Sequence, residues 1–177
     1  MLERSFNGSI LCLEKGDLTA LEIESIVFYA RPDLKLGSGF GSAIAERGGM
    51  SIQEELKSFG IISTGEAVVT SAGNLKAHYI VHAVGPRFQE KGFSDKLRAT
   101  IQTALNAANA KGIKRIAFPP MGSGFYGIPL ATCSRIMMEE LSHYLKNDSS
   151  FDQIMICVLD NREYSAFHNI WDEFNIN

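Results

Sequence analysis

The sequence predicts an α/β fold, a three-layer α/β/α sandwich around a mixed, mostly parallel sheet. Apolar runs of strand length alternate with helical patterns along the chain. One of these runs, residues 23–30, is apolar at both alternating sets of positions, as in a central strand that is covered on both faces. The length of 177 residues suits one core, so we expect residues 1–177 to form a single domain.

The individual elements follow from local patterns. Apolar runs bounded by turn residues predict strands over residues 9–14, 23–30, 66–71, 79–84, 115–118 and 153–159. Apolar residues spaced three or four apart predict helices over residues 42–46, 51–59, 94–111, 130–146 and 162–174. We expect Ser51 to cap the second helix in a capping box with Glu54, and Ser94 to cap the third. Gly60 and Gly112 are the expected stops of these two helices.

Two glycine-rich loops each lie between a predicted strand and a predicted helix. Gly122, Gly124 and Gly127 follow the strand over 115–118, while Gly37, Gly39 and Gly41 follow the strand over 23–30. A strand, a glycine loop and a helix together point backbone N–H groups at an anion. Either loop alone could be a tight turn that binds nothing. Both loops would lie at the carboxyl ends of strands, where open α/β sheets bind ligands, and a diphosphate could lie between them.

Composition and charge exclude several classes of function. The net charge is −3 and no Lys/Arg run stands out, so we expect no nucleic-acid polymer as a partner. No apolar run approaches the roughly 20 residues that span a membrane, and residues 1–9 lack a signal pattern, which predicts a cytoplasmic location. Cys12, Cys133 and Cys157 are widely spaced without a CxxC pair, which predicts buried or half-buried reduced thiols and no metal site. We also expect no cofactor.

Several segments, in order and spacing, match the motifs of one known family. The sequence reads GDLT at residues 16–19, GEA at 65–67 followed by Thr70, YIVHAVGP at 79–86 and FPPMGSGFYGIP at 118–129. Together they resemble the macro domain, the ADP-ribose-binding α/β module, over residues 9–174. The resemblance implies that the ligand is ADP-ribose or a related ADP-ribose derivative, free or attached to protein.

The resemblance also implies a set of binding residues. Asp17 would accept a hydrogen bond from the adenine amino group, with the Leu18 backbone beside it. One wall of the diphosphate cleft would be formed by Gly37, Ser38, Gly39 and Phe40, and the other by Gly122, Ser123, Gly124, Phe125 and Tyr126. Hydrogen bonds to a charged acceptor contribute about 1.5–3 kcal/mol each. A few of them would account for much of the roughly 8 kcal/mol of a micromolar ligand.

The chain departs from the family at three places. Arg31 replaces the last asparagine of the family's NAAN strand end, which contacts the distal ribose and orients water in the hydrolases. Gly41 stands where many members carry a catalytic aspartate. Leu159, or Asp160 if the register shifts by one, takes the place of an aromatic residue against the adenine. The usual hydrolytic pair is therefore missing, and the leading prediction is a binding module.

Alternatives remain open at this stage. Arg31 could be a surface arginine paired with Asp33, or could simply fill the distal pocket. It could instead place a guanidinium there and favour a ligand with an extra terminal anion. The protein could also be an ADP-ribosyl hydrolase or an ADP-ribose-1″-phosphate phosphatase that uses a non-standard set of residues. A third possibility is a scaffold that has lost nucleotide binding and serves as an interaction partner.

Three further features favour structural roles. His82 lies within a predicted strand, where a hydrogen-bonded core histidine is the more common case. Glu66 is expected to be a surface residue at the strand end or a clamp on the backbone. The sequence NAAN at 106–109 falls inside a predicted helix, so it is not the family motif.

Overall fold

A seven-stranded mixed sheet forms the centre of the molecule. The computed structural model describes residues 1–37, 39–147 and 150–174. The strands are β1 (Leu2–Phe6), β2 (Ser9–Lys15), β3 (Ser25–Ala30), β4 (Ala67–Ser71), β5 (Tyr79–Val84), β6 (Arg115–Phe118) and β7 (Gln153–Val158). Their spatial order is β1-β2-β7-β6-β3-β5-β4. The five inner strands are parallel to one another, and β1 and β4 are added antiparallel at the two ends. The predicted mixed, mostly parallel sheet is confirmed.

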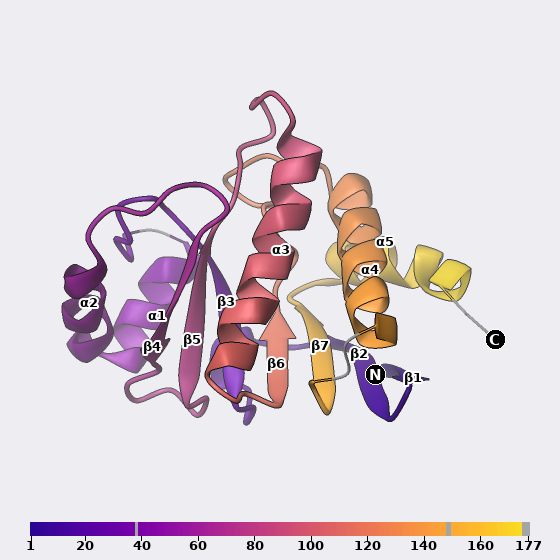
Figure 1. Ribbon diagram of the computed structural model, residues 1–177, viewed down its shortest axis with the longest axis horizontal. Coiled ribbons are helices and arrows are strands. Elements are labelled where there is room, and N and C mark those ends of the chain that lie inside the picture. The colour runs from indigo at the N-terminus through magenta and orange to yellow at the C-terminus, as the bar shows by residue number, and fades with distance from the viewer. Residues whose placement is uncertain (38, 148–149, 175–177) are drawn as a thin grey trace.

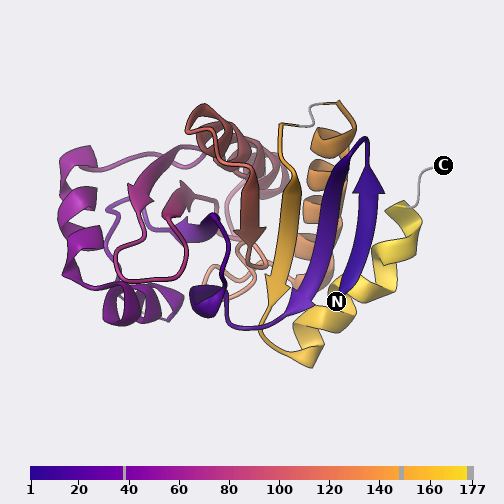
Figure 2. The same ribbon diagram turned by 90° about the horizontal axis from the view of Figure 1, so that it is seen from below.

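Helices cover both faces of this sheet, which gives the predicted three layers (Figures 1 and 2). The α-helices are α1 (Phe40–Gly48), α2 (Met50–Leu56), α3 (Phe93–Ala110), α4 (Leu130–Asn147) and α5 (Asn161–Trp171). Short 3-10 helices are η1 (Leu18–Ala20), η2 (Lys57–Phe59) and η3 (Asp172–Phe174). Figure 1 shows α3 and α4 lying across the near face of the sheet, with α1 and α2 on the other face.

The side chains of the strands divide between two cores. Alternate residues of a strand point to opposite faces, so β7 contributes Ile154 and Ile156 to the core under α3, α4 and α5, and Met155 and Cys157 to the core under α1 and α2. Both sets are buried. This explains why the central strands are continuous apolar runs, and it fixes the register of the residues at their ends.

The structure differs from the sequence-based prediction at the N-terminus. Strand β1 was not predicted, and it pairs with β2 through a tight hairpin. Asn7 and Gly8 both have positive φ, 46° and 91°, as a two-residue hairpin turn of the I′ type requires.

The predicted serine N-caps of two helices were also wrong, while Gly60 and Gly112 follow the ends of these helices as predicted. Helix α2 follows Gly49, and α3 follows Gly92, so Ser51 and Ser94 lie inside the helices and form no cap. Glu54 forms an ion pair with Lys57 in place of the expected capping box. No helix in the part of the chain that the structure describes is both long and apolar enough to cross a bilayer.

Candidate functional site

The parallel strands bring the predicted binding residues to one edge of the sheet. Strands β2, β7, β6, β3 and β5 all run in one direction, so their carboxyl ends meet at what we call the carboxyl edge. Along this edge, Asp17 follows β2, Leu159 follows β7, the second glycine loop (residues 119–129) follows β6, and Arg31 with the first glycine loop (residues 37–41) follows β3. The two loops therefore leave adjacent strands.

The second glycine loop is shaped by close packing beneath it. Gly122 has a φ of 77°, and a Cβ built there would lie 2.6 Å from Cδ1 of Ile128 and 3.0 Å from the hydroxyl of Tyr29. Only glycine fits this conformation and this space. The N–H of Ile128 donates to the Gly122 carbonyl, and the N–H of Gly127 donates to the Gly124 carbonyl, which close the loop. The N–H groups of residues 123–126 have no acceptor among the described residues, so this loop can offer donors to a ligand.

Tyr126 links the second loop to the end of β3. Its hydroxyl donates to the Ala30 carbonyl at 3.4 Å, and its ring packs edge-on against Tyr29 with centroids 4.8 Å apart. Its carbonyl accepts from the N–H of Phe88 at 3.0 Å. Phe125, by contrast, is 88% exposed and contacts the Tyr126 ring. The loop is thus anchored at Tyr126 and presents its neighbour to solvent.

The segment that leads into the first glycine loop is held by Gln53 of helix α2. The side-chain oxygen of Gln53 accepts from the N–H of Leu36 at 2.9 Å, and its amide group donates to the Leu34 carbonyl at 3.2 Å. Helix α1 begins at Phe40 directly after Gly39, so the free N–H groups of its first turn face the carboxyl edge. Ser38, predicted to contribute to the same wall, lies outside the described residues.

Arg31 lies beside the first loop and is oriented by Asp33. Its Nη2 forms an ion pair with Asp33 at 2.8 Å, and its Nη1 lies 3.6 Å from the position of a Cβ on Gly37. Asp33 is itself held by the N–H of Lys35. The Arg31 side chain remains half-exposed. The surface pair with Asp33 that the sequence suggested is therefore present, and it directs the guanidinium over the loop.

The carboxylate of Asp17 already has partners within the protein. One oxygen accepts from the N–H and the hydroxyl of Thr19, at 2.9 and 2.7 Å, and so caps η1. The other oxygen forms an ion pair with Arg47 in the last turn of α1. The Thr19 bond and the Arg47 bond lower the pKa of Asp17, so it is an anion at neutral pH. Asp17 is thus the turn former, and both of its carboxylate oxygens already have partners within the protein.

Leu159 and Leu18 border the same end of the edge. Leu159 is 71% exposed at the end of β7, while Leu18 is buried in η1. Asp160 caps helix α5 by accepting from the N–H of Glu163. Asp160 is thus engaged in the cap, while Leu159 presents an exposed apolar side chain at the end of β7, the strand next to β2.

A bulky side chain lies against one departure from the family pattern, Gly41. Phe28 packs against the rings of Phe40 and His82, and its Cζ lies 3.0 Å from the position of a Cβ on Gly41. Any side chain at residue 41, including an aspartate, would press on this ring. Phe28 and Gly41 therefore fit each other. Phe40, predicted as a wall of the cleft, is partly committed to this packing.

The buried ionisable groups have structural surroundings. His82 is buried and shares a hydrogen bond of 2.8 Å with the hydroxyl of Thr70, and burial lowers its pKa to about 3. Glu66, which is exposed, accepts from the N–H of Ser63, as a backbone clamp. Cys12, Cys133 and Cys157 are buried and free, and burial raises the pKa of each thiol. Within the described ranges, no three His, Cys, Asp or Glu side chains gather as a metal site would require.

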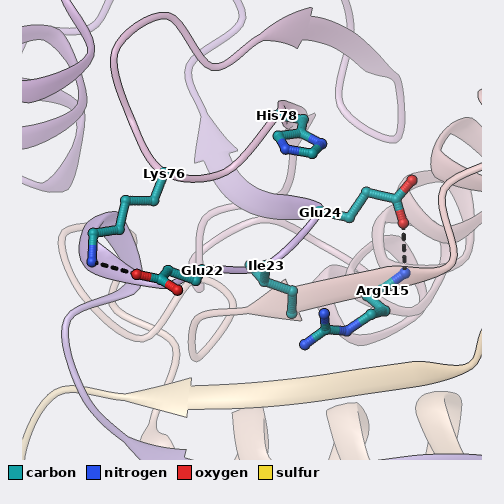
Figure 3. Close-up of a pocket in the computed structure, with 6 residues that line it drawn as sticks. All are labelled: Glu22, Ile23, Glu24, Lys76, His78 and Arg115. Atoms are coloured by element: carbon teal, nitrogen blue, oxygen red, sulfur yellow. Dashed lines mark hydrogen bonds and ion pairs between the residues drawn. The ribbon is translucent and has the colours of Figure 1, made fainter.

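A pocket at the amino ends of the parallel strands, opposite the carboxyl edge, is a depression of the surface. It has a volume of about 600 Å³ and is lined by Glu22, Ile23, Glu24, Lys76, His78 and Arg115 (Figure 3). Glu22 is paired with Lys76, and Glu24 accepts from the N–H groups of Lys114 and Arg115. The carboxylates of Glu22 and Glu24 thus already have partners within the protein. A second pocket of about 640 Å³ lies next to the first loop and is bordered by Asp33, Gly37 and Gln53.

Sequence reasoning missed several residues that shape this edge. Arg47 reaches Asp17 from a helix 30 residues further along, and Arg87 lies over the Tyr126 ring at 6.0 Å. Gln53 holds the segment that leads into the first loop. None of these residues has a motif of its own, because each contact depends on how distant segments meet in the fold.

Comparison with known proteins supports the fold and the family. The family model described as Macro domain matches residues 30–137. An uncharacterized protein of Saccharolobus solfataricus is 39% identical over 93% of this chain and 94% of its own length. A macro domain-containing protein of Caldanaerobacter subterraneus is 35% identical over 92% of this chain and 96% of its own.

Solved macrodomains superpose closely. A structure of the Oceanobacillus iheyensis macrodomain with ADP has a TM-score of 0.92 at 23% identity, covering 97% of this chain and 95% of that one. The Trypanosoma brucei macrodomain in complex with ADP has a TM-score of 0.83 at 28% identity, covering 90% and 67%. From the family match over more than half of its residues and from these relatives, we conclude that the chain belongs to the macro domain family.

Proposed function

We propose that this protein binds ADP-ribose, free or attached to another protein, in a cleft between its two glycine loops. The observation that carries the proposal is that both loops leave adjacent parallel strands, β3 and β6, in a chain of the macro domain family. Further support comes from similar solved macrodomains that are complexes with ADP.

The order of the strands gives each part of the ligand a place in this proposal. The adenine lies near β2 and β7, where Asp17 accepts from its amino group and Leu159 contacts its ring. The diphosphate lies between the loops and accepts from the backbone N–H groups of residues 123–126 and of the first turn of α1. The second ribose then extends toward Arg31, beyond the diphosphate.

Binding without the family's usual hydrolysis is the function that these residues favour. Arg31 and Gly41 hold the positions of the family's asparagine and aspartate. Asp33, the carboxylate beside Arg31, accepts from both Arg31 and the N–H of Lys35 and is therefore already engaged. The alternative of a hydrolase or phosphatase would depend on Arg31 stabilising charge that develops on the substrate.

Calorimetric titration with ADP-ribose and thermal shift test the proposal. Ligand at 100 times its Kd should stabilise the fold by about 2.7 kcal/mol. Gly124→Val should abolish this binding, because a Cβ at Gly124 meets nothing within 4 Å and the added side chain would occupy the space of the diphosphate. The ligand-free variant should melt as the wild type does. If the wild type gives no heat and no shift with ADP-ribose, the proposal is wrong.

Turnover separates binding from catalysis. Incubation with ADP-ribosylated protein and with ADP-ribose-1″-phosphate should leave both unchanged. Release of ADP-ribose or phosphate by the wild type, and its loss in Arg31→Ala, would instead establish the enzymatic alternative.

A further inference from the structure

We propose that Arg31 and Arg87 form an anion subsite beside Tyr126, which selects ADP-ribose derivatives that carry an additional phosphate on the ribose far from the adenine. The inference rests on the proposed function and assigns the specificity of the same site. Its basis is where these two arginines lie relative to the loops.

The strand order places both arginines past the diphosphate. Arg31 follows β3, and Arg87 follows β5, the next strand in the sheet. Asp17 follows β2 at the other end of the carboxyl edge. A ligand with its adenine at Asp17 and its diphosphate between β6 and β3 must therefore direct its second ribose toward Arg31 and Arg87.

Tyr126 brings the two arginines to one place. The guanidinium of Arg87 lies over the Tyr126 ring, 6.0 Å from its centroid. The Tyr126 hydroxyl donates to the Ala30 carbonyl, which belongs to the peptide bond that joins Ala30 to Arg31. Burial raises the pKa of Tyr126, and the charges of Arg87 and Arg31 both oppose this rise, as expected for cations close to the ring.

The nearby carboxylates, Asp33 and Glu90, do not fully neutralise the positive charge around Arg31 and Arg87. Asp33 balances Arg31 through a single Nη2 bond, which leaves the other N–H groups of the guanidinium for a ligand. Glu90 accepts from the backbone N–H of Arg87 and from Lys96, which neutralises it. Among the described residues no ion pair joins the Arg87 guanidinium to a carboxylate, and its charge is the smallest of the causes that lower the pKa of Glu90, so it can turn toward an anion.

Guanidinium chemistry indicates a phosphate as the preferred group. The planar fork of an arginine matches the oxygens of a phosphate in pairs, and a nearby second cation adds to the attraction. Asp33 fixes the direction of the Arg31 side chain through their ion pair. Nη1 of Arg31 lies 3.6 Å from the position that a Cβ on Gly37 would take, so the guanidinium lies against the first glycine loop. A neutral ribose hydroxyl would use little of this charge.

The test is a comparison of two ligands by calorimetry at one ionic strength: ADP-ribose and ADP-ribose-1″-phosphate. The wild type should bind the phosphorylated ligand about tenfold to a hundredfold more tightly, the range for charge-assisted hydrogen bonds. Arg31→Gln should reduce this ratio of affinities at least tenfold, Arg87→Gln should reduce it less, and Arg31→Lys should restore part of it.

Arg115→Gln is the matched control, because it removes the same charge from an arginine at the opposite edge of the sheet. It should keep the wild-type ratio. If the wild type binds ADP-ribose but shows no preference, or if Arg31→Gln and Arg87→Gln both keep the preference, the anion subsite is refuted while the proposed function stands. If neither ligand binds, both proposals fail together.

Discussion

The Tyr29 ring occupies the space that a side chain on Gly85 would need. A Cβ built on Gly85 would overlap Cζ and Oη of Tyr29, far inside van der Waals contact. The ring cannot move away easily, because its hydroxyl donates to the Pro86 carbonyl at 2.5 Å and its face packs on Tyr126. Tyr29 thus joins the end of β3 to the segment after β5, beneath the second glycine loop.

Gly85→Ala should therefore destabilise the protein. Overpacking of a filled core costs about 1–3 kcal/mol, and we expect a loss in this range in the free energy of unfolding measured in urea. Gly124→Ala is the control, because a Cβ there meets nothing within 4 Å and its stability should be unchanged. Equal stability of both variants would show that the Tyr29 ring can shift after all.

Phe28 and Gly41 should be energetically coupled. Gly41→Ala brings a methyl group to 3.0 Å from Cζ of Phe28 and 3.4 Å from Cα of Leu36, so it should destabilise the wild type. In a Phe28→Leu background the same change should cost less, by at least about 0.5 kcal/mol in a double-mutant cycle. If the changes in the free energy of unfolding are additive, the contact between residue 41 and Phe28 does not contribute to stability.

Asp17→Asn should weaken ADP-ribose binding about tenfold to a hundredfold, from the loss of one charged acceptor. The asparagine keeps an oxygen for the Thr19 bonds but replaces the other with an amide that cannot accept from the adenine amino group. Titration with the hypoxanthine analogue is the control, since that base lacks the amino group. A similar loss for both ligands would assign Asp17 to the turn alone.

His82 should make stability depend on pH. Its pKa falls from 6.5 when unfolded to about 3 in the folded protein, so between these values only the unfolded state takes up the proton. Its contribution is complete above pH 6.5 and is lost as the pH falls toward 3. We expect the free energy of unfolding to drop by about 2 kcal/mol between pH 7 and pH 5.

Urea denaturation of two variants separates His82 from other groups. His82→Gln should flatten this part of the pH profile even if it is less stable at pH 7. His143→Gln removes an exposed histidine and should keep the wild-type slope. An unchanged slope in His82→Gln would mean that other groups produce the effect.

The central strands and the glycine loops could be predicted because they follow from local patterns. Residues 23–30 are apolar on both faces, and this alone indicates a covered strand between helices. Strand β1 also had a signal, the Asn7-Gly8 pair between two strand-like segments, which is typical of a type I′ hairpin. The side chains of β1 alternate between partly buried and exposed, and these residues form a strand because they pair with β2.

The contacts that complete the candidate site could not be predicted in the same way. Gly49 and Gly92 are the N-caps of α2 and α3, although the sequence favoured the nearby serines. The surrounding fold gives the backbone a positive φ at both positions, which glycine adopts most readily. Arg47 and Tyr29 matter through partners 30 and 57 residues away. Such pairs leave no local pattern in the sequence, because they form only when distant helices and strands pack together.

Helix α1 touches the candidate site at both of its ends, with Gly39 before its first turn and Arg47 in its last. If the ligand binds as proposed, α1 connects the contact to the base with the contact to the phosphates. A tilt of the helix that moves Arg47 away from Asp17 would then also displace the backbone amides of its first turn, so the affinities for the two parts of the ligand would change together.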